Sequence, residues 1–311
     1  MNNTKHLISI IGPTAIGKTS LAIALSKKYS APILSSDSRQ FYKEMHIGTA
    51  VPSEEELSAA PHFFIQHKSI EDNYSVGDFE REAMAFLNNH FLKNDVAIMV
   101  GGSGLYTDAV CKGLDKFPEV PNHIRADLNE SLAHFGLEKL TNKLKELDPK
   151  TFHQIDIDNP VRVIRALEVC LASGKPYSSF LNQPKKKRLF LVHTINISAP
   201  RDTLYERINQ RVDLMIKNGL EEEVRGLFDQ KKLNALNTVG YKELFNYMEG
   251  KITRETAIEE IKKNTRRFAK RQLTWNRKNT EALVVNYQNA LEESMTYLDK
   301  VIPTSQNTTN S

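Results

Sequence analysis

The chain has 311 residues, of which 40% are hydrophobic and 26% charged, as expected for a folded protein with one large domain or two modest ones. The N-terminal apolar run Leu7–Ile11 is too short to span a membrane and leads into a glycine loop, so a membrane or exported protein is not expected. The two cysteines, Cys111 and Cys170, cannot build a disulfide framework or a zinc cluster and favour a cytoplasmic protein.

Basic residues concentrate in one part of the chain. The net charge is +4, but the segment Lys251–Lys278 holds ten basic and three acidic residues and therefore carries +7 by itself. The rest of the chain must then sum to −3. This asymmetry indicates a polyanionic partner, although a solvated helix face is the simpler explanation for a basic run alone.

Short apolar runs alternate with helical patterns in the first part of the chain. Buried strands are predicted at Leu7–Ile11, Ile33–Ser35 and Val96–Val100, and helices at Thr19–Lys28 and Ser75–Leu92. Strands that alternate with helices in this order predict an α/β fold in which a doubly wound parallel sheet is covered on both faces.

The middle of the chain has a different, helical pattern. Helices are predicted at Ile124–Phe135, Leu137–Glu146 and Pro160–Ser173. We therefore expect residues 115–187 to form a helical insertion domain, inside a core made of residues 1–114 and 188–302.

After the insertion, the pattern returns to that of the core. A strand is predicted at Leu189–Ile197, followed by C-terminal helices at Arg201–Asn218, Leu220–Gln230 and Arg254–Trp275. In the last helix we expect a buried stripe formed by Ile258, Ile261, Phe268 and Trp275. Residues 303–311 are predicted to be a disordered tail.

A phosphate-binding loop is predicted directly after the first strand. The residues Gly12, Pro13, Thr14, Ala15, Ile16, Gly17, Lys18 and Thr19 match G-x-x-x-x-G-K-[ST]. The glycines allow backbone N–H groups to point at phosphate oxygens, while the helix N-terminus and Lys18 add positive charge. The Thr19 hydroxyl is a typical ligand of Mg²⁺ shared with the phosphates. We therefore expect a P-loop NTPase-like core with a nucleotide-binding or ATP-binding type of loop, rather than a chance glycine turn.

A P-loop does not specify the reaction. The sequence has no N-K-x-D or D-x-x-G motif where a GTPase would need one. The strand Val96–Val100 is followed by Gly101, Gly102, Ser103 and Gly104, so the carboxylate that most motor ATPases have there is missing. Small-molecule kinases and related transferases remain.

A candidate catalytic carboxylate follows the second strand. Asp37 is placed at the C-terminal end of a strand expected to neighbour the P-loop strand, which is where ligands bind in such sheets. It could act as a general base or hold a metal through water. It could equally be the N-cap of the next segment, and position alone leaves the two roles open.

Segments spread over nearly the whole chain resemble the tRNA dimethylallyltransferase (isopentenyltransferase) family of the bacterial type. They are Gly12–Thr19, Asp37–Gln40, His46–Ala50, Pro61-His62, Tyr74–Phe79, Val100–Tyr106, Asn159–Glu168, Arg207 with Arg211–Asp213, Gly240–Glu243 and Asn264–Trp275. Two positions depart from the family's usual pattern, since Ser103 replaces a Thr and Asn276 replaces a Phe.

The resemblance implies the activity and the catalytic residues. Members of the family transfer the dimethylallyl group of dimethylallyl diphosphate to N6 of the adenosine 3′-adjacent to the anticodon of tRNA, and release diphosphate. Asp37 would accept the N6 proton, Lys18 and Arg211 would bind the diphosphate, and Thr19 would bind Mg²⁺. A surface ion pair with Asp213 or Glu206 is the alternative role for Arg211.

The resemblance also implies how the tRNA anticodon stem-loop is held. The contacting residues would be Asp37, Ser38, Arg39, Gln40, Ser103, Arg125, Val161, Arg162, Val163, Ile164, Arg165, Thr238, Val239, Gly240, Tyr241 and Lys242. Arg162 and Arg165 are three residues apart and share one helix face, as expected for two side chains that contact RNA phosphates. Two arginines on a merely solvent-exposed helix face would have the same spacing. The basic last helix becomes a candidate tRNA-backbone surface.

Two other functions explain part of the sequence. A P-loop small-molecule kinase accounts for the phosphate loop and Asp37 but leaves the basic last helix unused. A non-catalytic RNA-binding protein accounts for that helix but not for an intact phosphate loop. We expect a monomer that binds tRNA and dimethylallyl diphosphate and no membrane.

Overall fold

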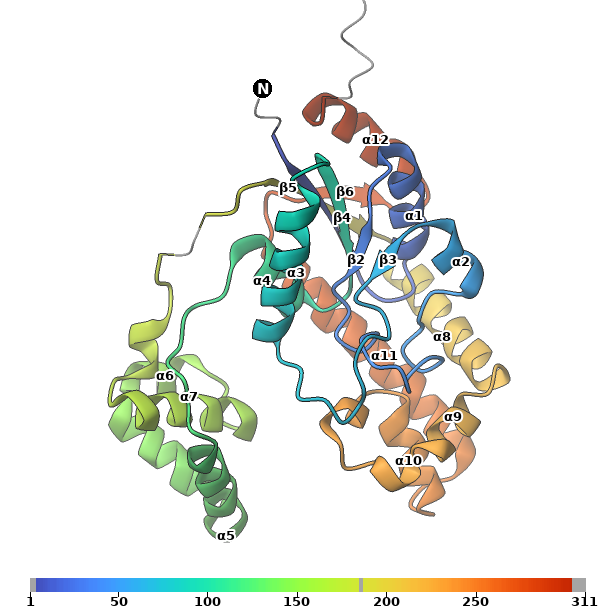
Figure 1. Ribbon diagram of the computed structural model, residues 1–311. Helices are drawn as coiled ribbons and strands as arrows, with labels where there is room; N and C mark the ends of the chain where they lie inside the picture. The colour runs from blue at the N-terminus through green and yellow to red at the C-terminus, as the bar shows by residue number, and fades with distance from the viewer. Residues whose placement is uncertain (1–3, 185–186, 304–311) are drawn as a thin grey trace, which may run out of the picture. The chain divides into compact units, whose positions relative to one another are not determined.

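The structure is a computed structural model that describes residues 4–184 and 187–303. The chain forms two compact units, one from residues 1–112 and 188–311 and the other from residues 113–187 (Figure 1). Apart from Pro303, the tail predicted to be disordered lies outside the described residues.

The first unit contains a six-stranded sheet in which every neighbouring pair of strands is parallel, in the order β3-β2-β4-β1-β5-β6. The strands are β1 (His6–Ile11), β2 (Ile33–Ser35), β3 (His62–Phe63), β4 (Val96–Val100), β5 (Leu191–Ser198) and β6 (Leu283–Asn286). The four strands predicted from the sequence are confirmed as β1, β2, β4 and β5. The two edge strands were missed because they are short and, unlike the three-residue β2, are not continuously buried: within them only Val285 is buried.

Helices cover both faces of this sheet, as the prediction of a doubly wound fold requires. Alternate residues of a strand point to opposite faces, so Ile8 and Ile10 of β1 pack with one set of helices and Leu7 with another. The first set comprises α1 (Lys18–Tyr29), α8 (Arg201–Lys217) and α12 (Ala290–Val301), and the second comprises α3 (Val76–His90) and α4 (Gly104–Lys112) (Figure 1).

A second core lies among the C-terminal helices of the same unit. Tyr241 and Leu244 pack there with residues of α8 and α11. The helices are α9 (Leu220–Gly226), α10 (Tyr241–Met248) and α11 (Arg254–Asn276), with 3₁₀ turns η2 (Phe228–Gln230) and η3 (Asn234–Leu236) between them. The helix predicted at Leu220–Gln230 is therefore wrong in its second half, where the chain turns. The short helices α2 (Glu54–Ala59), α4, α10 and α12 were not predicted.

The second unit is helical and has its own apolar core. It contains α5 (Asn122–Leu147), α6 (Pro149–Gln154), α7 (Pro160–Ser173) and the 3₁₀ turn η1 (Tyr177–Phe180). Within α5, Gly136 has a φ of 75° and breaks the helix where the sequence predicts two separate helices. Leu140, Leu144 and Leu167 are central in the core between α5 and α7. No helix in the described parts of the chain is both long and apolar enough to span a membrane.

Candidate active site

The phosphate loop connects β1 to α1 and has the backbone conformation that its glycines predict. Gly17, the N-cap of α1, has a φ of 101°, which an L side chain rarely adopts. A Cβ at Gly12 would lie 3.0 Å from the carbonyl oxygen of Ile197 on β5. The Lys18 ammonium donates hydrogen bonds to the carbonyl oxygens of Gly12 at 3.1 Å and Pro13 at 2.7 Å. Lys18 therefore curls back over the loop, at the place where a phosphate would bind.

A small polar cavity of about 290 Å³ adjoins this loop. Three basic side chains line it, namely Lys18, Arg207 and Arg211. Burial lowers the pKa of Lys18 to about 8, with Asp37 opposing this effect and Arg211 adding to it. Burial, and then the neighbouring Arg207, also lower the pKa of Arg211. Partly desolvated cations that repel one another are stabilised by an anion, so this cavity is suited to a diphosphate.

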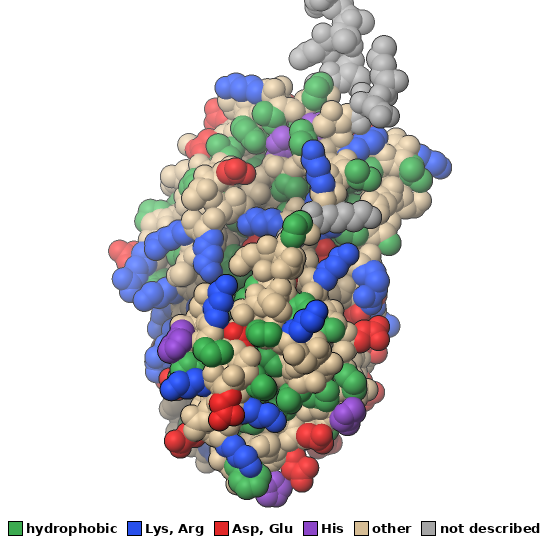
Figure 2. All heavy atoms as spheres, turned by 90° about the vertical axis from the view of Figure 1, so that its left-hand side faces the viewer, with side chains coloured by type: hydrophobic (Ala, Val, Ile, Leu, Met, Phe, Trp, Pro, Cys, Tyr) green, Lys and Arg blue, Asp and Glu red, His purple; other side chains and the backbone are tan. Residues whose placement is uncertain are grey.

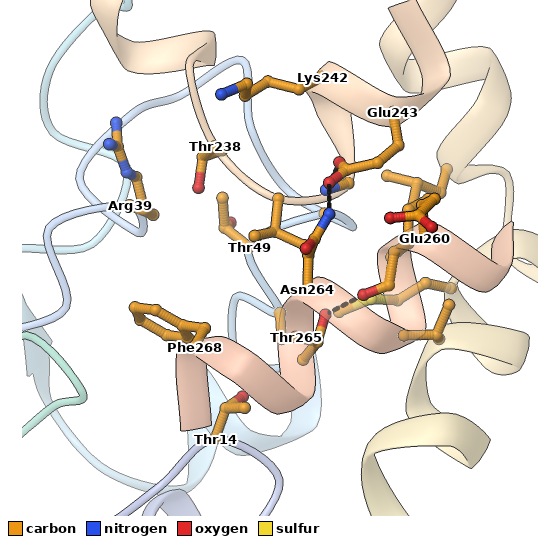
Figure 3. Close-up of a pocket in the computed structure, with 18 of the residues that line it drawn as sticks. Thr14, Arg39, Thr49, Thr238, Lys242, Glu243, Glu260, Asn264, Thr265 and Phe268 are labelled. Carbon is orange, nitrogen blue, oxygen red and sulfur yellow. Dashed lines mark hydrogen bonds between the residues drawn. The ribbon is translucent and has the colours of Figure 1, made fainter. Parts of the chain in front are cut away.

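A larger cavity of about 720 Å³ lies beside the first. Most of the residues predicted to contact the tRNA loop in the core unit line it, namely Asp37, Ser38, Arg39, Ser103, Thr238, Val239, Gly240 and Lys242. Figure 3 shows Phe268, Asn264 and Thr265 projecting from α11 toward the same space as Thr49 and Thr238. The walls are both polar and apolar, as a nucleobase requires.

The two cavities meet at a shared set of residues. Thr14, Asp37, Thr49, Ala50 and Arg211 line both of them. Asp37 therefore lies between the space suited to an anion and the space suited to a base. The Arg211 guanidinium donates to the Thr14 hydroxyl at 3.3 Å, so Arg211 contacts the phosphate loop and makes no ion pair with Asp213 or Glu206 within the described residues.

Asp37 sits in a tight turn after β2. One of its carboxylate oxygens accepts the backbone N–H of Arg39 at 3.1 Å, and its carbonyl oxygen accepts the N–H of Gln40 at 3.0 Å. Asp37 therefore makes the side-chain bond to the backbone that a helix N-cap would make. Here the bond closes a local turn, because no regular helix follows. A side chain held in this way has a fixed direction, which suits a general base equally well.

The loops after β2 and β4 are adjacent because these strands are parallel and in register, with Ser35 opposite Val100. The Ser103 hydroxyl accepts the backbone N–H of Ser38 at 3.0 Å and lies 3.0 Å from the Ser38 hydroxyl. The Ser103 hydroxyl therefore joins the loop after β4 to the loop after β2. The hydroxyl of the Thr that is usual in the family could make the same bonds. The Gln40 amide donates to the Ala50 carbonyl oxygen at 2.9 Å and lines only the smaller cavity.

Several glycines between β4 and α4 allow α11 to come close to the site. A Cβ at Gly102 would lie 2.3 Å from the Gln272 amide nitrogen, and one at Gly104 would lie 2.2 Å from the Trp275 ring. Gln272 and Trp275 were not predicted as site residues. Both residues belong to the segment Asn264–Trp275 that resembles the family. Their partners Gly102 and Asp108 lie about 170 residues earlier in the chain, so only the fold brings them into contact.

Tyr241 does not line the cavity as predicted for a tRNA contact. Its side chain is fully buried, and its hydroxyl donates to the Glu223 carboxylate at 2.6 Å. The same carboxylate accepts the backbone N–H groups of His46, Ile47 and Gly48 at 3.0, 2.7 and 3.0 Å. Tyr241 and Glu223 therefore shape the loop that carries Thr49 and Ala50 into both cavities.

In the second unit, some of the residues of α7 that were predicted to contact tRNA are exposed and others are buried. Val161 and Arg162 are exposed, whereas Val163 is fully buried and Ile164 is 7% exposed. The side chains of Val163 and Ile164 belong to the apolar core and are therefore not available for the tRNA contacts predicted for them. Arg125 and Arg165 both pair with the buried carboxylate of Glu168, and both keep part of their surface exposed.

The basic helix α11 is less uniformly charged at its surface than its sequence suggests. Lys262 pairs with Asp213 and Glu259, and Lys263 with Glu260. Arg267, Lys270 and Arg271 are exposed farther along the helix. Figure 2 shows that basic side chains are spread over the visible face of the molecule, among acidic and apolar ones.

The predicted apolar stripe of α11 is only partly correct. The buried residues of the helix are Ala257, Ile261, Ala269, Gln272 and Asn276. Phe268 instead lines the larger cavity, and the Trp275 indole N–H donates to Asp108 at 2.9 Å.

Comparison with known proteins places this site in a family. A model of the IPP transferase family matches residues 40–279. The tRNA dimethylallyltransferase of Christiangramia forsetii is 56% identical over 301 residues, which cover 97% of this chain and 100% of that protein. The chain belongs to the tRNA dimethylallyltransferase family. The resemblance inferred from the motifs is thereby confirmed.

Further members of the family agree in sequence and in structure. The tRNA dimethylallyltransferase of Flavobacterium johnsoniae is 52% identical over 94% of this chain and 97% of that protein. The crystal structure of the tRNA isopentenylpyrophosphate transferase of Bacillus halodurans has a TM-score of 0.71 and 33% identity, and covers 96% of this chain and 97% of that one. The chain is therefore a prenyl-transferring enzyme with a P-loop-like fold, and the kinase alternative receives no support.

Proposed function

We propose that this member of the tRNA dimethylallyltransferase family transfers the dimethylallyl group of dimethylallyl diphosphate to N6 of the adenosine 3′-adjacent to the tRNA anticodon. The observation that carries the proposal is the junction of the two cavities at Asp37. A donor and an acceptor that enter from opposite sides would meet there. We also propose that the enzyme acts in the cytoplasm as a monomer.

The smaller cavity would bind the diphosphate. Inward backbone N–H groups of the loop Gly12–Thr19, with Lys18 and Arg211, would hold its oxygens. When the bond between the prenyl carbon and the diphosphate oxygen breaks, its electron pair leaves with the diphosphate, whose charge grows. Donors fixed before the reaction stabilise that growing charge more than they stabilise the substrate, and this difference lowers the barrier.

The residues present fit Mg²⁺ as an ion held mainly by phosphate oxygens and water. Thr19 and Asp37 line the smaller cavity, and no group of three or more His, Cys, Asp or Glu side chains that could hold a metal occurs within residues 4–184 and 187–303. Thr19 would bind the ion through its hydroxyl, and Asp37 through water. The ion would neutralise part of the diphosphate charge.

The larger cavity would receive the adenine base, flipped out of the anticodon loop. The exocyclic N6 is a weak nucleophile because its lone pair is delocalised into the ring. Asp37 would accept the N6 proton as the nitrogen forms its bond to the prenyl carbon. Ser38, Arg39 and Ser103 would contact the base, while Thr238, Val239, Gly240 and Lys242 would contact the loop around it.

The second unit would hold the tRNA farther from the reacting atoms. Arg162 and the partly exposed Arg125 and Arg165 are suited to phosphate contacts, and Val161 offers an exposed apolar side chain. Because Arg125 and Arg165 share Glu168, their orientation is set within the unit before any RNA binds.

The proposal is tested by incubating the protein with unmodified tRNA, dimethylallyl diphosphate and Mg²⁺, followed by mass spectrometry of the nucleosides. We expect a prenylated adenosine from the position beside the anticodon and an equal amount of released diphosphate. A parallel reaction with labelled ATP in place of the prenyl donor should transfer no label. Binding of tRNA without any product would contradict the proposal and favour a non-catalytic RNA-binding protein.

A further inference from the structure

Gln272 of α11 connects two loops of the site through its side-chain amide. Its oxygen accepts the backbone N–H of Thr14 in the phosphate loop at 2.9 Å, and its nitrogen donates to the carbonyl oxygen of Gly102 at 2.9 Å. The residue is only 6% exposed. A neutral amide can accept the first of these bonds with its oxygen and donate the second with its nitrogen.

The two loops that Gln272 joins carry groups from both cavities. Thr14 lines both cavities and accepts a hydrogen bond from Arg211. Gly102 adjoins Ser103, which is bonded to Ser38 next to Asp37. The chain of contacts therefore runs from the phosphate loop through Gln272 to the loop that borders the carboxylate.

The same helix also forms a wall of the larger cavity. Phe268 and Asn264, about one and two turns before Gln272, line that cavity together with the adjacent Arg271. Helix α11 therefore contacts the phosphate loop through Gln272 and lines the proposed base pocket through Asn264, Phe268 and Arg271.

We propose that Gln272 is a positioning residue that fixes the phosphate loop at Thr14 relative to Asp37, and so sets where the prenyl carbon lies with respect to the base. This inference rests on the proposed function, because it assigns the diphosphate to the P-loop cavity. Gln272 also lines the smaller cavity, but its amide oxygen and nitrogen bond Thr14 and Gly102, so we assign its effect to these two contacts and no part in bond making to the residue itself.

The main test compares Gln272→Met with wild type. Methionine has a similar length but makes neither hydrogen bond, so the phosphate loop loses its attachment to α11. A shift of the donor by about 1 Å can cost on the order of 10²-fold in rate, and we expect kcat/KM for dimethylallyl diphosphate to fall by about 10- to 100-fold. The KM for tRNA should stay close to the wild-type value.

Asn276→Ala is the matched control. Asn276 is equally buried at 6% exposure and lies one turn further along the same helix, but it does not line either cavity. A merely structural role for Gln272 predicts that Gln272→Met loses thermal stability while the kcat/KM for the prenyl donor stays at the wild-type value in both variants. The positioning role predicts that the kcat/KM for the prenyl donor falls in Gln272→Met and stays at the wild-type value in Asn276→Ala.

A double-mutant cycle with Gly102 tests the contact itself. A Cβ on Gly102 would lie 2.3 Å from the Gln272 amide nitrogen, so Gly102→Ala should damage catalysis in the wild-type background. In the Gln272→Ala background this clash disappears, and adding Gly102→Ala should cost little more. Losses that simply multiply in the double variant would contradict a direct contact between the two residues.

Binding of inorganic pyrophosphate, measured by calorimetry, separates this inference from the proposed function. Weaker binding in Gln272→Met than in Asn276→Ala supports the positioning role without relying on product formation. Wild-type affinity in Gln272→Met, together with unchanged kcat/KM, overturns it. Absence of prenyl transfer by the wild-type protein overturns the proposed function instead.

Discussion

At the scale of single residues, one carboxylate borders both cavities and three cations line the smaller one. Asp37 borders both cavities, whereas Lys18, Arg207 and Arg211 all line the smaller one. Arg211 contributes to the lowered pKa of Lys18, and Arg207 contributes to the lowered pKa of Arg211. Binding of a diphosphate would relieve this repulsion and, at the same time, bring the reacting carbon next to Asp37.

The role of Asp37 is tested by Asp37→Asn. The amide has nearly the same shape and can still accept the N–H of Arg39, so the turn should survive. It cannot take up the N6 proton, and the rate should fall by about 10²- to 10⁴-fold while the affinities for tRNA and pyrophosphate stay within a few-fold. Single-turnover kinetics and thermal melting of the same preparation measure both effects. A near-normal rate with a lower Tm would mean that Asp37 serves only the turn.

At the scale of secondary-structure elements, α11 has two different surfaces. Its N-terminal lysines are neutralised by neighbouring carboxylates, as Lys262 is by Asp213 and Glu259. Arg266 donates to Asn209 on α8 and is partly buried. The exposed cations farther along, Arg267, Lys270 and Arg271, are therefore better candidates for tRNA phosphate contacts than the helix as a whole.

Replacing Arg267, Lys270 and Arg271 together by Gln should weaken tRNA binding and reduce its salt dependence. Each lost phosphate contact removes roughly 0.7–0.9 from the slope of log affinity against log salt, so the loss of three contacts would lower the slope by up to roughly 2–3. Binding titrations at several salt concentrations measure this slope. The double variant Lys262→Gln, Lys263→Gln is the control, because these charges are already paired, and it should change the slope much less. Equal slopes in all three proteins would show that this end of α11 does not contact RNA.

The adjacent strands β1 and β5 share a buried histidine pair. His6 Nδ1 and His193 Nε2 lie 2.9 Å apart, and His193 Nδ1 lies 3.3 Å from the Tyr297 hydroxyl. Burial lowers the pKa of both histidines; Asp95 opposes the effect at His6, whereas His6 adds to it at His193. The unfolded chain therefore binds protons at a higher pH than the folded protein does, and folding is most favourable where both rings are neutral.

The stability contributed by this pair should be present above pH 6.5, the ordinary histidine pKa, and be lost as the pH falls below it. We expect the Tm to fall by a few degrees between pH 7.5 and pH values near 5, measured by calorimetry. The double variant His6→Gln, His193→Gln should show a smaller change over the same range, because the amides do not titrate. An identical pH dependence would assign the effect to other groups.

At the scale of the whole molecule, the two units are joined at neighbouring points of the core. Arg188, at the return to the core, donates to the carbonyl oxygen of Ala109 in α4 at 2.6 Å and also pairs with Glu80. The chain therefore leaves and re-enters the core at nearby positions. An insertion connected in this way can be removed with little cost in loop closure.

Replacing residues 113–187 by a short Gly-Ser linker should leave a folded core that binds pyrophosphate within a few-fold of wild type. Both cavities are lined only by residues of the core unit. Affinity for tRNA should fall by more than tenfold, and prenyl transfer should be lost with it. Calorimetry with pyrophosphate and tRNA measures the two affinities separately. Unchanged tRNA binding would show that the second unit is not part of the tRNA site.

The sequence alone determined the parts of the site that are contiguous in the chain. The phosphate loop depends on a local order of glycines and Lys18 between a strand and a helix, and this order requires no distant partner. The strands β1, β2 and β4 were predicted because buried parallel strands are mostly apolar runs. The position of Asp37 followed from the same rule, since parallel strands end at one edge of the sheet.

Only the tertiary structure decided which side chains face a cavity and which belong to a core. Tyr241 was predicted to contact tRNA but is buried against Glu223, whereas Phe268 was predicted to be buried and lines the larger cavity. The period of a helix shows which residues share a face but not what that face meets. The bonds of Gln272 to Thr14 and Gly102 join residues far apart in sequence, so they exist only once the strands, the glycine loop and α11 have packed together.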